Sequence, residues 1–303
     1  MALLLALAGQ QASEISIANE SPYGRVALGA AFWGLQGLAF LVASDALQRL
    51  RISGFALTGL LLAGVLPIAA VLLSGWCTDL SLLKEFANQR EVFGEALLRH
   101  LQIVSLALLP TLLVGWPLAW VAHRHSAVGN SVFAVLNIVQ TVTSIALFGL
   151  FMAPLAALAL AYPILGRAGL SGIGLAPAVL ALWLYALLPV VRAGVAGLAQ
   201  VPQGVVTAAQ AMGIGAGKIF WLVEVPLALP IVLSGVRTAA VQAVGLAALT
   251  ALVGAGGLGS ILFEGLFSSA NELVLLAVIP IVALAVLVDA AFKTLMALVP
   301  NHR

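Results

Sequence analysis

The sequence predicts an all-α protein, a polytopic bundle of about seven membrane-spanning helices. Of its 303 residues, 63% are hydrophobic and 8% are charged, whereas an ordinary globular domain is about 25% charged. The apolar residues also form long runs almost free of charge, and a membrane helix needs about 20 such residues. Because these runs are continuous and do not alternate with polar residues, they favour helices over the strands of a barrel.

The charge-free runs give the order of the spans. We expect spans at 26–43, 54–73, 101–122, 130–153, 176–198, 227–253 and 273–292. Pro154 and Pro163 predict that the fourth helix ends near residue 153 and that a turn-rich, re-entrant stretch follows. Residues 1–9 are apolar but lack the basic start of a signal peptide. Cleavage within residues 1–12 and a membrane-associated or frayed N-terminus therefore both stay open.

These spans divide the chain into three parts. Residues 1–75 form an N-terminal extension with two additional helices, 76–99 form a polar external loop, and 100–298 form a core of five spans. With the C-terminus inside, eight of the 13 Lys and Arg residues lie on the inner side and five on the outer side, which agrees with the positive-inside rule. The same orientation puts the connection 200–226 on the inner face.

Several functions are excluded by composition and motif checks. A net charge of only +2 argues against a nucleic-acid partner, and Cys77 alone permits neither an internal disulfide nor a multi-cysteine metal site. His123 and His125 do not share a helix face. The run 254–259 matches GxGxxG but follows a membrane span instead of a strand, so it indicates close helix packing, not nucleotide binding. We predict no catalytic residue and no metal.

Charged and polar residues inside spans are costly in a membrane and are therefore candidate functional residues. Arg192, Arg237 and Asp289 are candidates for structural or gating roles, as are the glycines of the GxGxxG run, Gly256, Gly257 and Gly259. The chain shows no series of buried acids, which weakens the hypothesis of a proton-coupled carrier. The fourth span carries a polar cluster that either lines a translocation path or holds helices together: Asn137, Gln140, Thr141, Thr143 and Ser144.

The connection 200–226 has the pattern of a helix, a glycine break and a second helix. A short helical run at 205–212 is followed by Gly213, Gly215 and Gly217, which interrupt it, and Pro226 precedes the next span. This shape suits the docking of another protein on the inner face, although a simple connection between two spans fits the pattern equally well.

The spacing within 200–226 resembles the EAA loop of ABC-importer permeases. Thr207-Ala208-Ala209 is followed after three residues by Gly213 and after nine more by Val-Glu-Val-Pro at 223–226. The family pattern is Glu-Ala-Ala, three residues, Gly, nine residues, Ile-x-Leu-Pro, so Thr207 replaces its usual glutamate. Further segments resemble the permeases of osmoprotectant importers, which take up glycine betaine, choline and carnitine: 140–147 (with Thr143 in place of the family's proline), 185–192, 225–231, 235–238 and 254–259. Methionine-importer permeases share the loop and a similar glycine run.

The resemblance implies a permease of the bacterial inner membrane. The chain would form half of a two-permease pore, with a second copy or a sister permease, for quaternary-ammonium osmoprotectants such as glycine betaine or choline. Methionine or another amino acid is the alternative substrate, and a secondary carrier is a less favoured alternative. An external binding protein would deliver the substrate, and separate cytoplasmic ATPase subunits would bind ATP and magnesium, so this chain itself would bind no cofactor.

In this family, residues 203–217 would insert as a coupling helix into a groove of the ATPase. The family's coupling residues correspond to Thr207, Ala208, Ala209, Gly213, Gly215, Lys218, Glu224 and Pro226.

Overall fold

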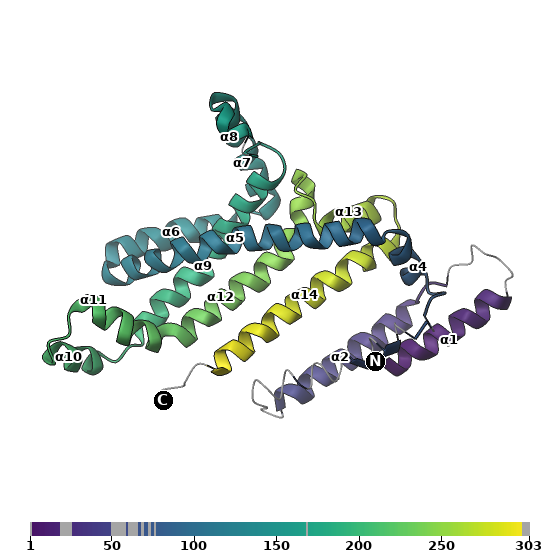
Figure 1. The fold of residues 1–303 in the computed structure, drawn as a ribbon, viewed down its shortest axis with the longest axis horizontal. Helices are drawn as coiled ribbons and strands as arrows, with labels where there is room; N and C mark the ends of the chain where they lie inside the picture. Colours follow the sequence, from purple (N-terminus) through teal and green to yellow (C-terminus); the bar gives the residue numbers. More distant parts are fainter. Residues whose placement is uncertain are drawn as a thin grey trace.

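The computed structural model describes residues 2–18, 26–49, 77–167 and 169–298, together with residues 59, 66, 67, 70, 71, 74 and 75. Helices account for most of this part of the chain (Figure 1). In order they are α1 (Ala2–Ala18), α2 (Ala30–Arg49), α4 (Ser81–Asn88), α5 (Arg90–Arg124), α6 (Ser126–Thr141), α7 (Ser144–Ala161), α8 (Pro163–Arg167), α9 (Leu175–Ala199), α10 (Gln203–Ala211), α11 (Ala216–Ile219), the π-helix η1 (Phe220–Glu224), α12 (Val225–Ala247), the 3-10 helix η2 (Ala248–Val253), α13 (Leu258–Phe267) and α14 (Asn271–Leu298).

Five of the described helical segments are long and apolar enough to cross a membrane: 90–124, 144–161, 175–199, 216–253 and 271–298. The first expected span overlaps α2, which begins at Ala30, but the apolar part of this helix, Ala30–Ala43, is shorter than those five segments. The second expected span, 54–73, lies largely outside the described residues.

The expected fourth span, 130–153, is wrong because two helices share it. Helix α6 ends at Thr141, and α7 begins at Ser144. Val142 and Thr143 between them have extended backbone, with ψ values of 134° and 144°. The expected helix end at residue 153 is also wrong, since α7 continues through Pro154 to Ala161. Proline is tolerated inside membrane helices because neighbouring groups satisfy the freed backbone carbonyl.

The segment 76–99, expected as a loop, is mostly helical. It contains α4 and the first ten residues of α5. Leu82 and Phe86 of α4 and Phe93 and Leu97 of α5 pack against the main hydrophobic core. An amphipathic helix buries only one face and carries polar residues on the other. A prediction based on charge-free runs therefore does not detect it. The side of the membrane on which this segment lies stays a prediction.

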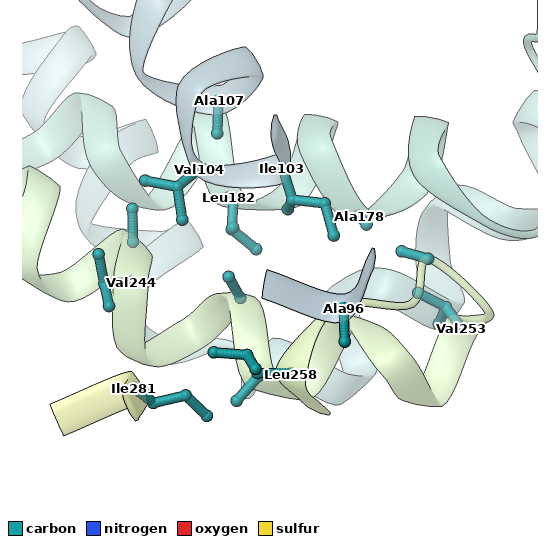
Figure 2. Close-up of a cluster of buried hydrophobic side chains, with 14 of the residues drawn as sticks. Ala96, Ile103, Val104, Ala107, Ala178, Leu182, Val244, Val253, Leu258 and Ile281 are labelled. Atoms are coloured by element: carbon teal, nitrogen blue, oxygen red, sulfur yellow. The ribbon is translucent and has the colours of Figure 1, made fainter. Parts of the chain in front are cut away.

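The main core lies where α5, α9 and α12 meet α13 and α14. Figure 2 shows Ile103, Val104 and Ala107 of α5 directed toward Leu182 of α9, with Leu258 and Ile281 nearby. Small residues let the helix backbones approach closely. A Cβ atom added at Gly235 of α12 would lie 2.2 Å from the Ala193 Cβ atom and 2.6 Å from the Pro189 carbonyl oxygen of α9.

Two segments lie outside the main core. Helices α10 and α11 lie at the far ends of α9 and α12, away from α13 (Figure 1). Helix α1 packs through Ala12 and Leu5 against Cys77 and Leu80 in the approach to α4.

Candidate functional site

Helix α10 ends in a Schellman motif centred on Gly213. Gly213 has a φ of +76°, a left-handed conformation that costs an L-residue side chain about 1–2 kcal/mol. Its N–H donates to the Gln210 carbonyl at 2.9 Å, and the Ile214 N–H donates to the Ala209 carbonyl at 3.2 Å. These two bonds satisfy carbonyls at the helix end that otherwise have no intrahelical partner. The glycine therefore fixes both the end of α10 and the direction in which the chain leaves it.

The predicted coupling residues divide into an exposed group and a buried group. Thr207, Ala208, Gly213, Gly215, Lys218 and Pro226 are exposed, whereas Ala209 and Glu224 are buried. The hydroxyl of Thr207 donates to the Gln203 carbonyl at 3.0 Å, one helical turn away. Two of the three glycines lie at the break, but Gly217 was expected to break the helix and instead lies inside α11. Because Gly217 has helical neighbours on both sides, only the residues from Met212 to Gly215 interrupt the helices.

An ion pair joins α5 to the π-helix that follows α11. Arg124 is the last residue of α5, and its Nη2 atom donates to the two carboxylate oxygens of Glu224 at 2.9 and 3.0 Å. The Glu224 side chain is 10% exposed and that of Arg124 is 45% exposed. Glu224 was expected within the coupling loop, whereas Arg124 was not expected as its partner. Glu224 is the single acidic residue between 96 and 263, and a buried carboxylate needs a cation, so the sequence did contain a signal for such a partner.

The polar cluster of the expected fourth span lies around the break between α6 and α7. Arg192 of α9 donates through Nη2 to the Asn137 side-chain oxygen at 3.0 Å, and Gln140 donates to the Tyr185 carbonyl at 2.8 Å. The Tyr185 hydroxyl donates to the Val142 carbonyl in the break itself. Tyr185 thus stands in for part of the missing helical hydrogen bonding, a role that the sequence did not reveal.

Exposure separates the members of this cluster. Asn137, Thr141 and Thr143 are exposed, while Gln140 and Ser144 are half-buried. Asn137 and Thr141 are four residues apart on α6 and so share one face. Arg192 is also exposed, so α6 and α9 present a polar, positively charged face within an otherwise apolar bundle.

Arg237 and Asp289, separated by 52 residues in the chain, form an ion pair between α12 and α14. The Nε atom of Arg237 lies 2.5 Å from one carboxylate oxygen of Asp289, and Nζ of Lys293 lies 2.8 Å from the other. All three side chains are partly exposed. The pairing satisfies two charges that would be costly alone in a span and ties the last two long helices together.

The glycine run 254–259 forms a tight turn held against α5. Gly254, Gly256 and Gly257 all have positive φ. Arg99 donates through Nε to the Ala255 carbonyl at 2.9 Å, and the buried His100 contacts the Val244 carbonyl through Nε2 at 3.1 Å. These two α5 residues are positioning residues that the sequence analysis did not identify.

The chain is similar to known membrane transport proteins. Residues 111–299 match the family described as "binding-protein-dependent transport system inner membrane component". Residues 1–83 match the N-terminal domain of the ABC transporter permease YehY.

Two relatives among many show the range of similarity. The chain is 37% identical over 195 residues to the osmoprotectant import permease protein OsmW of Salmonella typhimurium, which covers 63% of this chain and 84% of that protein. It is 31% identical over 190 residues to the glycine betaine/carnitine/choline transport system permease protein OpuCB of Bacillus subtilis, covering 63% of this chain and 80% of that protein. A solved structure of the MetNI methionine ABC transporter in inward-facing conformations matches with a TM-score of 0.62 and 21% identity, covering 71% of this chain and 99% of that one.

Proposed function

The chain belongs to the family of binding-protein-dependent transport system inner membrane components, and from that premise we propose that it translocates quaternary-ammonium osmoprotectants such as glycine betaine or choline. It is a multi-pass permease of the ABC-importer type in the bacterial inner membrane. Support for the substrate class comes from relatives named for osmoprotectant, glycine betaine, carnitine and choline transport. In this proposal the partners are a second permease, cytoplasmic ATPase subunits that bind ATP and magnesium, and an external binding protein.

The observation that carries the ATP-driven part of the proposal is helix α10, which is exposed and has a fixed C-terminal end. Its exposed residues Thr207 and Ala208 form a small surface suited to close approach by a partner, and Gly213 fixes its end. The Arg124–Glu224 pair joins the segment that follows α10 to the end of α5. A movement imposed on α10 by the ATPase therefore passes to α5 and α12 as a rigid-body rotation.

The path for substrate is proposed along the exposed polar face of α6 and α9. Asn137, Thr141 and Arg192 supply polar groups there. A cationic or zwitterionic substrate is bound tightly by aromatic rings through cation–π attraction, and in this family the external binding protein supplies that tight site. The permease needs only weak contacts, because a path that bound its substrate tightly would release it slowly.

The N-terminal part is proposed as an extension of this permease core. Residues 1–75 would contribute two additional membrane helices, the first of them overlapping α2. The core of five spans then begins near residue 100, and the intervening α4 covers part of the core through Leu82 and Phe86.

The test is co-purification of the full chain with an ABC-importer ATPase subunit co-expressed from the same organism, followed by reconstitution in liposomes. We expect ATP hydrolysis to rise when a binding protein loaded with glycine betaine or choline is added outside. Stimulation by methionine-loaded binding protein alone would move the substrate class and keep the permease assignment. Uptake by the chain without any ATPase, driven by an ion gradient, would contradict the proposal.

A further inference from the structure

A groove of about 430 Å³ lies between the end of α5 and the helices that follow the α10 break. Trp116, Trp120 and Arg124 of α5 line one side, and Gly217, Phe220 and Trp221 line the other. The ring of Phe220 lies 6.2 Å from Trp116 and 5.9 Å from Trp120, measured between centroids. The groove therefore touches both a membrane-spanning helix and the proposed coupling segment.

The rim of the groove has the character of a membrane–water interface. Trp221 is 63% exposed and Trp120 is 40% exposed, and on the same helices Leu113 and Leu222 are 75% and 69% exposed. Exposed leucines suit contact with lipid chains, and tryptophan is enriched where chains meet headgroups. The groove thus opens where the apolar surface of α5 gives way to charged residues.

The exposed charged side chains at the groove, Arg124 and Lys218, are basic. Glu224 is buried and satisfied by the Nη2 atom of Arg124. Within the described part of the chain, the Nε and Nη1 atoms of Arg124 donate no hydrogen bond, and the exposed Lys218 adjoins the lining residue Gly217. The chain carries no acidic residue from 96 to 223, so Glu224 is the sole carboxylate in this region of the sequence.

We propose that this groove binds one anionic phospholipid, with an acyl chain along the tryptophan and phenylalanine rings and the phosphate at Arg124 and Lys218. An arginine fork with unused N–H groups is well matched to phosphate oxygens. The apolar lining excludes a soluble anion as the occupant, since that ligand would leave the aromatic rings in contact with water. The lipid bridges α5 and the π-helix, so its presence stiffens the joint through which α10 acts. This proposal rests on the membrane location of the chain and not on its substrate.

The test measures quenching of tryptophan fluorescence by brominated lipids in nanodiscs that contain the full chain. Brominated phosphatidylglycerol is titrated into phosphatidylcholine discs, and brominated phosphatidylcholine is titrated separately. We expect half-maximal quenching at roughly 30-fold lower mole fraction for phosphatidylglycerol, which corresponds to about 1 kcal/mol for each of the two basic residues, Arg124 and Lys218, near an anionic headgroup.

Three variants separate the site from general membrane charge. Arg124→Gln alone leaves Glu224 buried without a partner and risks misfolding, so the double variant Arg124→Gln/Glu224→Gln removes both charges together. It should lose most of the preference for phosphatidylglycerol, whereas Arg90→Gln at the other end of α5 should keep it. Trp221→Phe should lower the quenched amplitude while leaving the preference in place.

Three outcomes would overturn the proposal. The first is equal quenching by the two lipids in the unmodified chain. The second is a full preference for phosphatidylglycerol in the double variant. The third is no loss of quenched amplitude in Trp221→Phe, which would mean that the groove is closed to lipid and covered by protein.

Discussion

Replacement of Gly213 gives the sharpest test of the coupling segment. At a φ of +76°, an alanine side chain costs about 1–2 kcal/mol, and a Cβ atom added there meets no other atom within 4 Å. The penalty is therefore one of backbone strain alone. Helix α10 has only nine residues, fewer than an isolated helix needs to be stable, so its end depends strongly on this cap.

The backbone strain at residue 213 lowers the fraction of molecules in which α10 ends correctly. A cost of about 1–2 kcal/mol lowers that population roughly 5- to 30-fold relative to alternatives of similar free energy. Gly213→Ala should therefore lower ATP-driven uptake in proteoliposomes severalfold, and Gly213→Val should abolish it. Gly213→Asn should lose less, because asparagine tolerates the left-handed region.

The matched control is Gly94→Ala in α5. Gly94 also has open space around its Cβ position, and its φ is not in the left-handed range. Alanine there favours the helix by about 1 kcal/mol, so uptake should be unchanged. Membrane insertion and yield are measured for every variant. Normal ATP-dependent uptake by Gly213→Val would refute the reasoning and, with it, the assignment of α10 as the coupling helix.

Three further predictions concern packing elsewhere in the chain. Gly259→Ala puts a Cβ atom 1.8 Å from the Ala248 carbonyl oxygen, so thermal unfolding in detergent should show that the free energy of unfolding falls by about 3 kcal/mol or more. Gly245→Ala, which has open space around its Cβ position, should cause no loss, and equal unfolding midpoints for the two variants would argue against the tight turn. Burial raises the pKa of the Cys77 thiol, so maleimide should label it slowly in the native chain and rapidly after deletion of residues 2–18; rapid native labelling would contradict the packing of α1. Thr143→Pro should be tolerated and stabilise by about 0.4–1 kcal/mol, because its φ of −64° is the proline value, and a lowered unfolding temperature would show that the break needs a residue other than proline.

The errors in the predicted helix boundaries have a common cause. The spans were predicted from runs without charge, and such a run does not show where a helix ends. Between residues 126 and 161 the chain carries no charged residue, and the carbonyl of Val142, just after the end of α6, accepts a hydrogen bond from Tyr185. That bond comes from a helix 43 residues away, so no local pattern encodes it.

By itself, the sequence determined the all-helical membrane class, the order of most spans and the helix–glycine–helix shape of 200–226. These follow from local causes. Apolar runs of about 20 residues favour a membrane environment, and glycine and proline mark the ends of helices. Only the tertiary structure decided that Glu224 pairs with Arg124, that Arg237 pairs with Asp289, and that α5 and the π-helix enclose a groove. The two ion pairs join residues 100 and 52 positions apart, and such pairings depend on which helix faces meet, which no local pattern in the sequence encodes.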